Sequence, residues 1–163
     1  MADISRKPIF TPTVFYRDPR AALDWLARAF GFEVSVLLTD AAGNIGHAEM
    51  SFRGGHVGVA GEWAGPQLGG AAMRSPASLG GAGSQFLWVE LEDGLDAHCE
   101  RARLAGARIV QAPEEQFYGA RTYRALDQEG HVWCFRQEVR SVSQTEMEAA
   151  SGLKANVLKA EGA

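Results

Sequence analysis

The stretch TVFYRDPRAALDWLARAFGFEVSVLL, residues 13–38, shares one plan with FLWVELEDGLDAHCERARLAGARIV, residues 86–110. Each contains a strand-like apolar run, an Asp, a helix-like stretch, a Gly and a second strand-like run. Asp18 lies thirteen residues before Gly31, and Asp93 lies thirteen residues before Gly106. The two stretches therefore indicate an internal repeat with an offset of 75 residues.

The residues at both ends of each helix-like stretch are typical helix boundaries. Asp18 is expected to cap the first helix, Pro19 suits its first position, and Gly31 suits its left-handed end. In the second copy we expect Asp93 to be the cap and Gly106 the end.

Three strand-like segments follow each predicted helix. After the first helix they are residues 32–38, 46–52 and 56–62, with a turn at Arg53-Gly54-Gly55. After the second helix they are residues 107–111, 121–127 and 131–137, with a tight turn at Asp127-Gln128-Glu129-Gly130. Both copies thus predict the order strand, helix, three strands.

The rest of the chain connects or follows these copies. Residues 61–83 are rich in Gly, Ala, Pro and Ser and show no period, which predicts a long flexible connection. Ser143 and Glu146 form a capping box that starts a short helix ended by Gly152, and no regular structure is expected in 153–163. We divide the single domain 1–163 into a first module (8–62), a linker (63–83), a second module (84–138) and a C-terminal helix and tail (139–163).

Composition excludes several classes of function. A net charge of −4 with scattered basic residues argues against a nucleic-acid surface, and no apolar run is long enough to span a membrane. The N-terminal sequence MADISRKPIF does not have the pattern of a signal peptide, so we expect a cytoplasmic protein with Cys99 and Cys134 as reduced thiols. Nucleotide-binding, zinc and hydrolase motifs are missing from the sequence.

Two phrases resemble the vicinal oxygen chelate superfamily in its glyoxalase and bleomycin-resistance branch. They are FYRDPRAALDWLARAFGF, residues 15–32, and the pair YGAR, residues 118–121, and DQEGHVW, residues 127–133, in which Gln128 replaces a commoner proline. The resemblance implies an α+β fold of two tandem βαβββ modules. Together they would form a curved eight-stranded open-barrel cradle, followed by the short C-terminal helix.

Metal-dependent members of that superfamily hold a divalent cation with one ligand from the first and last strand of each module. Counting along this sequence places those four positions at Thr11, Gly58, Phe86 and Cys134, of which only Cys134 is a good ligand. We therefore expect no metal and no cofactor. A register shift of two residues would keep the same strand face and leave open a poor site from His56, Glu90 and Cys134.

Aromatic side chains on the expected inner face favour a planar or apolar guest, with simple core filling as the alternative. Trp63, in the linker, is expected to close over the guest as a lid. The predicted ligand-binding residues are Thr13, Phe15, Trp63, Phe86, Trp88, Tyr118, Arg121 and Cys134, and no catalytic residue is assigned. Other polar residues have plainer interpretations: His131 would bond turn backbone, Trp133 would pack on the outer strand face, and His98 would be a surface residue.

Three hypotheses about function follow. The first is a metal-free homodimeric protein that binds or sequesters a small aromatic or hydrophobic compound, similar to bleomycin-resistance proteins. The second is a divalent-metal-dependent lyase, isomerase or dioxygenase similar to glyoxalase I. The third is a structural or regulatory dimer with a vestigial pocket.

Overall fold

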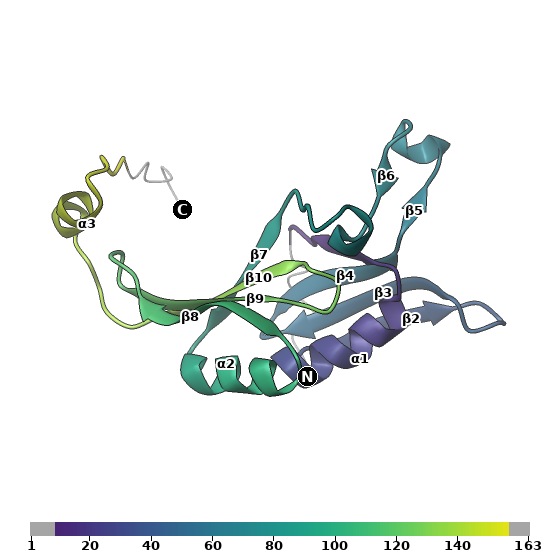
Figure 1. The fold of residues 1–163 in the computed structure, drawn as a ribbon, viewed down its shortest axis with the longest axis horizontal. Coiled ribbons are helices and arrows are strands. Elements are labelled where there is room, and N and C mark those ends of the chain that lie inside the picture. The colour runs from purple at the N-terminus through teal and green to yellow at the C-terminus, as the bar shows by residue number, and fades with distance from the viewer. Residues whose placement is uncertain (1–8, 157–163) are drawn as a thin grey trace.

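The strand–helix–three-strand order occurs twice in the computed structural model, which describes residues 9–156 (Figure 1). The first module consists of β1 (Thr13–Tyr16), α1 (Pro19–Phe30), β2 (Glu33–Thr39), β3 (Ile45–Phe52) and β4 (Gly55–Gly61). The second module consists of β7 (Phe86–Leu91), α2 (Leu95–Leu104), β8 (Arg108–Glu115), β9 (Ala120–Leu126) and β10 (Val132–Glu138). The α+β class and the repeated βαβββ order are confirmed.

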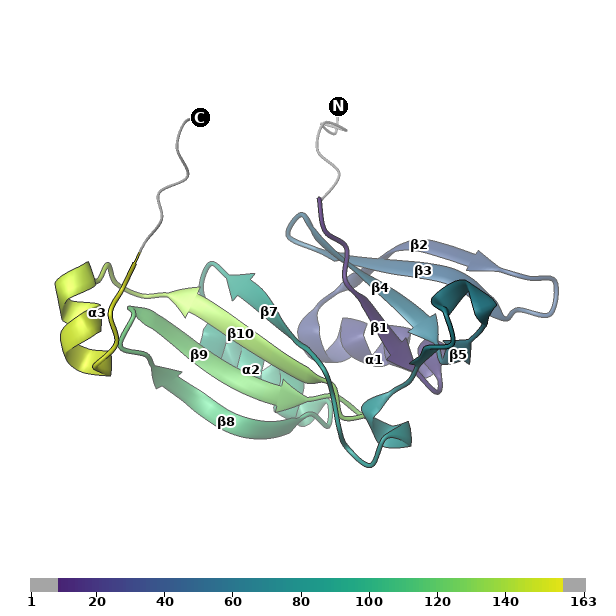
Figure 2. The ribbon, with the colours of Figure 1, turned by 90° about the horizontal axis from the view of Figure 1, so that it is seen from above.

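The eight module strands lie in two four-stranded mixed sheets with the same topology. Their orders are β1-β4-β3-β2 and β7-β10-β9-β8, and in each sheet the first and last strands of the module pair in parallel. Helices α1 and α2 lie on one side of the two sheets, and Figure 2 looks onto the other side. We call these the helix side and the open side.

The two helices begin in different ways. The Asp18 carboxylate accepts a hydrogen bond of 3.0 Å from the N–H of Ala21, and Gly31 ends α1 with a φ of 77°, so the predicted boundaries of α1 are confirmed. Helix α2 has Gly94 at its N-cap with a φ of 68°, and its first N–H, that of Leu95, donates a hydrogen bond of 3.0 Å to the side-chain carbonyl of Gln137 in β10. The prediction that Asp93 caps α2 is therefore wrong, because the left-handed turn at Gly94 leaves Asp93 one residue outside the cap.

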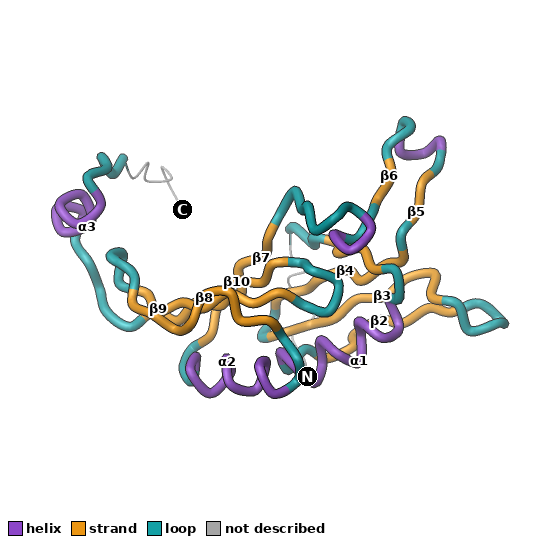
Figure 3. Tube along the Cα trace, viewed as in Figure 1, coloured by secondary structure: helices purple, strands orange, loops and turns teal. Residues whose placement is uncertain are grey.

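The connection between the modules has more structure than its sequence indicates (Figure 3). It contains a two-stranded hairpin of β5 (Trp63–Ala64) and β6 (Ala72–Met73), and the short 3-10 helices η1 (Pro66–Leu68) and η2 (Pro76–Ser78). Ser75 is fully buried, and its N–H donates a hydrogen bond of 2.8 Å to the Glu62 carboxylate. The expectation of a connection without periodic structure is corrected at these residues, because pairing within the segment and the bond from Ser75 to Glu62 order it.

The C-terminal part agrees with its sequence pattern. Helix α3 (Gln144–Ser151) begins with the capping box of Ser143 and Glu146 and ends at the left-handed Gly152. Residues 1–8 and 157–163, which carry part of the expectations about the two termini, lie outside the described residues. Among the helices that are described, none has both the length and the apolar character needed to cross a membrane.

Both modules contribute to one apolar core on the helix side. The ring of Phe30, at the end of α1, lies 5.5 Å from the Trp133 ring and 4.7 Å from the Phe135 ring of the other module. The indole N–H of Trp25 donates a hydrogen bond of 2.7 Å to the Ala105 carbonyl. The core therefore fixes the second module against α1.

His98 joins this contact between modules. Its ring nitrogens lie 2.6 Å from the Tyr123 hydroxyl and 2.9 Å from the Phe30 carbonyl oxygen. The prediction of a surface histidine is wrong, because α1 of the first module covers this face of α2. Burial is also the main cause that lowers the pKa of His98.

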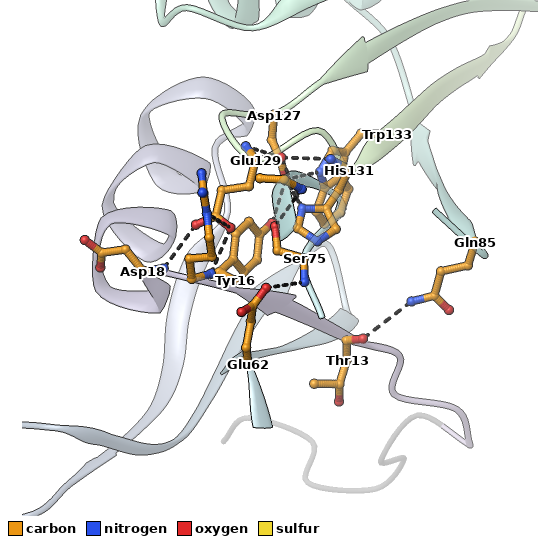
Figure 4. Close-up of polar contacts among 12 residues, drawn as sticks. Thr13, Tyr16, Asp18, Glu62, Ser75, Gln85, Asp127, Glu129, His131 and Trp133 are labelled. Carbon is orange, nitrogen blue, oxygen red and sulfur yellow. Dashed lines mark hydrogen bonds and ion pairs between the residues drawn. The ribbon is translucent and has the colours of Figure 1, made fainter. Parts of the chain in front are cut away.

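A second link between the modules is the carboxylate of Asp127 in the turn before β10 (Figure 4). It accepts hydrogen bonds from the Tyr16 hydroxyl at 2.7 Å and the Trp133 indole N–H at 3.0 Å. The ring of His131 lies 3.0 Å from the same carboxylate, so it contacts a side chain of the turn in addition to its backbone. Trp133 itself is buried on the helix side, as expected.

A neighbouring carboxylate strengthens this link. Glu129 accepts the backbone N–H groups of Arg17 and Asp18, at 2.8 and 3.0 Å. These two residues connect β1 to α1, so the closing turn of the second module holds the first strand–helix junction of the first module. An ionised carboxylate that accepts several hydrogen bonds is a strong anchor in a buried setting.

Replacing Asp127 with Asn is expected to lower the free energy of unfolding by about 3 kcal/mol at pH 7, since a buried hydrogen-bonded carboxylate is lost. Burial alone would raise the pKa of Asp127, but the bonds from His131, Trp133 and Tyr16 outweigh it and hold this pKa below its ordinary 3.8. The stabilisation is therefore complete above this ordinary value and disappears as the pH falls through the lowered pKa.

Urea unfolding at pH 7 and at several pH values from 5 to about 2 measures this effect. The advantage of the wild type over Asp127→Asn is expected to shrink in acid. The exposed Asp24→Asn serves as the matched control and should change stability by less than about 0.5 kcal/mol. Equal stability of the two variants at pH 7 would contradict the proposed anchor.

Candidate functional site

The open side of the second sheet presents three rows of side chains. Strand register fixes them, because β7, β10 and β9 pair without a shift over this region. The rows are Phe86–Val132–Leu126, Trp88–Cys134–Arg124 and Glu90–Arg136–Thr122. Successive residues of a strand point to opposite faces, so these rows share one face while Leu87, Trp133 and Tyr123 face the core. The first row is apolar, the second combines Trp88 with Arg124, and the third contains the charged Glu90 and Arg136.

Two large aromatic side chains are exposed on this face. Phe86 is 48% and Trp88 is 46% exposed, and their ring centroids are 5.8 Å apart. Residues of this size are usually buried in a folded chain unless they contact something else. The pair forms an aromatic platform on the open side of β7, and Figure 2 looks onto that side of the sheet.

A hollow of about 500 Å³, which we call the platform hollow, lies beside this pair. Its walls come from β7, from the turn before β10 and from the connection between the modules. The residues are Pro76, Gly81, Gly83, Ser84, Gln85, Phe86, Trp88, Gly130, His131 and Val132. Its size suits a small organic molecule, and its wall combines apolar and polar groups as ligand sites commonly do.

Another hollow, of about 470 Å³, lies between the modules and is lined both by core residues such as Met50 and Trp133 and by exposed residues such as Phe10 and Glu92. Trp88 lines both hollows. The platform hollow is the better candidate site because it includes both exposed aromatic residues.

Cys134 lies in the same row as Trp88. Its side chain is fully buried, and burial raises the pKa of its thiol, although the guanidinium of Arg124 acts in the opposite direction. Nucleophilic thiols require a lowered pKa. The burial and the raised pKa of Cys134 therefore do not favour a nucleophilic role.

Tyr118 lies next to the same face. The Arg136 guanidinium carbon is 5.7 Å from the centroid of its ring. Burial raises the pKa of Tyr118, and the charges of Cys134, Arg136 and Arg124 also act on it. The structure thus brings four of the predicted site residues together, which are Phe86, Trp88, Tyr118 and Cys134.

The other four predicted residues lie elsewhere. Thr13 and Phe15 are on the open side of the first sheet, since Val14 and Tyr16 between and after them are buried in the core. Trp63 belongs to the β5–β6 hairpin and is not among the residues of either hollow. Arg121 lies on the helix side, where its guanidinium forms two hydrogen bonds to Asp96.

The pairing of the first and last strand in each module shows which residues occupy the four positions of the superfamily's metal ligands. Thr13, two residues after the expected Thr11, is the partner of Gly58, and Trp88, two residues after Phe86, is the partner of Cys134. A Cβ atom at Gly58 would lie 2.6 Å from the Thr13 hydroxyl oxygen. Any larger side chain at position 58 would therefore displace Thr13, so this place does not fit a metal ligand.

The polar residues on the open side of the first sheet bind one another. The His47 ring lies 2.9 Å from the Glu49 carboxylate, and the His56 ring lies 3.9 Å from it. Within residues 9–156, no three His, Cys, Asp or Glu side chains are arranged to hold a metal ion. The set of His56, Glu90 and Cys134 is likewise not assembled as a metal site in this part of the chain.

Two arginines of this face were missed by the sequence analysis. Arg124 and Arg136 follow from the period of two in β9 and β10, counted from Thr122 and from Cys134. For Arg136 the alternation along β10 was sufficient, because Arg136 is two residues after Cys134 and therefore points to the same face. Arg124 required the strand pairing, which sequence alone does not provide.

Comparison with known proteins places the chain in one protein family. The Glyoxalase/Bleomycin resistance protein/Dioxygenase superfamily matches residues 9–135. An uncharacterised protein of Mycobacterium bovis is 31% identical over 147 residues, covering 90% of this chain and 94% of that protein. An uncharacterised protein of Mycobacterium tuberculosis shows the same identity over the same length, with 84% of its length covered.

Solved structures of similar fold include TioX from Micromonospora sp. ML1. It has 32% sequence identity and a TM-score of 0.61, and the match covers 82% of this chain and all of that one. TnmS3, an antibiotic binding protein from Streptomyces sp. CB03234, has 18% identity and a TM-score of 0.59, with 83% and 99% covered. The TnmS3 match concerns the fold alone.

Both cysteines are expected to react slowly with a disulfide reagent while the chain is folded. Cys99 and Cys134 are buried, and burial raises the pKa of each thiol. At pH 8 the folded protein should react at least about tenfold more slowly than free cysteine, and urea should restore the normal rate. A folded Cys99→Ala variant isolates Cys134, and rapid reaction of that variant would show an activated thiol.

Proposed function

We propose, because the chain belongs to the Glyoxalase/Bleomycin resistance protein/Dioxygenase superfamily, that it is a metal-free protein that binds and sequesters a small, partly aromatic compound. The observation that carries this proposal is the exposed pair of Phe86 and Trp88 beside the platform hollow. Burial of these rings by a planar guest would remove apolar surface from water and permit stacking.

Each part of the site has a role in this proposal. Phe86 and Trp88 stack on the guest, Val132 provides an apolar floor, and the connection around Gly81 forms a wall. Binding is stoichiometric and forms no covalent bond, in agreement with the raised pKa of the Cys134 thiol. TnmS3, described as an antibiotic binding protein, is an example of this fold in a binding role.

The proposal includes a cytoplasmic homodimer. Large apolar side chains are exposed on outer strands of both modules, including Leu38, which is 60% exposed, and Val110, which is 49% exposed. Strand edges and exposed apolar patches of this kind are commonly covered by a second copy. A partner that covers the open side would also reduce the solvent around the aromatic platform.

The neutral fluorophore N-phenyl-1-naphthylamine tests the binding function, because its emission rises when it leaves water. The wild type is expected to bind it, and Trp88→Ala should weaken binding by about 1–3 kcal/mol, as truncation of an aromatic anchor does. Trp63→Ala removes an equally large exposed side chain from the hairpin. An effect of Trp63→Ala as large as that of Trp88→Ala would support the predicted lid.

Thermal melting accompanies this titration, so that loss of folding is not mistaken for loss of binding. A folded Trp88→Ala variant that binds the fluorophore as well as the wild type would contradict the proposed platform. Absence of binding to the wild type would contradict the proposed function for neutral aromatic guests.

Light scattering after size-exclusion chromatography tests the dimer. The expected mass is twice the chain mass of 17.6 kDa at micromolar concentration. Leu38→Glu introduces a charge into an exposed apolar strand position and should shift the population toward monomer. A wild-type protein of single-chain mass would exclude the dimer under these conditions.

A further inference from the structure

The row beside the aromatic platform contains a guanidinium that is only partly satisfied. The Nε atom of Arg136 is buried and lacks a hydrogen-bond partner within the described residues. The Glu90 carboxylate is 3.5 Å away, which is too long for a good hydrogen bond. A buried donor without a partner is costly, so a bound acceptor at this place would be stabilising.

Arg124 is a second cation on the same face. It is exposed, and no ion pair involving it is found in residues 9–156. By contrast, Arg103 on α2 and Arg121 on the helix side are each bonded to a carboxylate. Arg124, on β9, is the partner of Cys134, and Arg136 is two residues after Cys134 on β10. The ring of Tyr118 lies against Arg136.

Negative charge does not cancel this pair. Glu90 faces Arg136, while Glu114, near Thr122, accepts a hydrogen bond from Gln116. One carboxylate thus opposes the two guanidinium groups in the rows of Trp88 and Glu90. The local field favours an anion beside an aromatic surface.

Spacing along the strand gives the shape of such a guest. Trp88 is level with Cys134, and Arg136 is two residues further along β10. Two residues of a strand span about 7 Å, roughly the length of two fused aromatic rings. A ring system on Trp88 would therefore place an attached oxyanion within reach of Arg124 and Arg136.

We infer that the site selects aromatic compounds that carry an oxyanion, such as a carboxylate or sulfonate, with the rings on Phe86 and Trp88 and the oxyanion between Arg124 and Arg136. This inference rests on the proposed binding function and adds the charge of the ligand to it. Guanidinium groups are well matched to planar oxyanions because two parallel N–H groups can donate at once.

Two fluorophores that share one ring system test the inference. They are 8-anilinonaphthalene-1-sulfonate and the neutral N-phenyl-1-naphthylamine, which lacks the sulfonate. The full-length wild type is expected to bind the sulfonate at least about tenfold more tightly, which corresponds to about 1.4 kcal/mol for a charge-assisted contact. This preference should decrease with added salt, because the cations are partly exposed.

Arg124→Gln and Arg136→Gln are each expected to remove most of this preference while leaving the affinity for the neutral fluorophore within about twofold. Arg103→Gln is the matched control, since it removes the same charge from the surface of α2 on the helix side. If a Gln variant melts early, the corresponding Lys variant keeps the charge and should retain part of the preference.

The results of these titrations distinguish the oxyanion inference from the proposed binding function. Binding of the neutral fluorophore without preference for the sulfonate would overturn the oxyanion inference and keep the proposed function. A preference that survives both Arg124→Gln and Arg136→Gln would also overturn it. Failure of both fluorophores to bind would overturn the proposed function together with the inference.

Discussion

The Asp127 carboxylate joins the end of β1 to the turn before β10, through the Tyr16 hydroxyl and the Trp133 indole. Glu129 extends the link to the backbone where β1 passes into α1. Residues more than a hundred positions apart are therefore fixed at one point. That turn leads directly into β10, and the pairing of β10 with β7 places Cys134 beside Trp88.

This anchor lies toward the core, on the helix side of the sheets. The helix side and the open side have different roles. Core aromatic residues such as Phe30, Trp133 and Phe135 pack on the helix side, where both modules share their apolar surface. The open side of the second sheet is left with Trp88, Arg124 and other groups that contribute little to the core. Its side chains are consequently free to serve recognition without a large cost in stability.

Local chemistry made part of this arrangement predictable. Asp18, Gly31 and the capping box of Ser143 act on backbone groups a few residues away, so sequence spacing was sufficient. The errors have different causes. His98 is covered by a distant segment, whereas the left-handed turn at Gly94 excludes Asp93 from the cap and a hydrogen bond from Ser75 to Glu62 orders the linker. For the site, the resemblance placed Phe86 and Cys134 on one face, and the period of two along the strand added Trp88. Only the strand register revealed Arg124 and placed Arg121 on the helix side.

The repeat also shows where the two modules differ. Thr13 and Gly58 occupy in the first sheet the positions that Trp88 and Cys134 occupy in the second. The first pair is small and tightly packed, with no space for a Cβ at Gly58, while the second has a large exposed aromatic ring. Both modules nevertheless place apolar residues such as Val59 and Phe135 on the helix side. Packing therefore constrains the helix side in both copies, whereas the open sides differ, since the second module carries the exposed Trp88 and the guanidinium groups of Arg124 and Arg136 there.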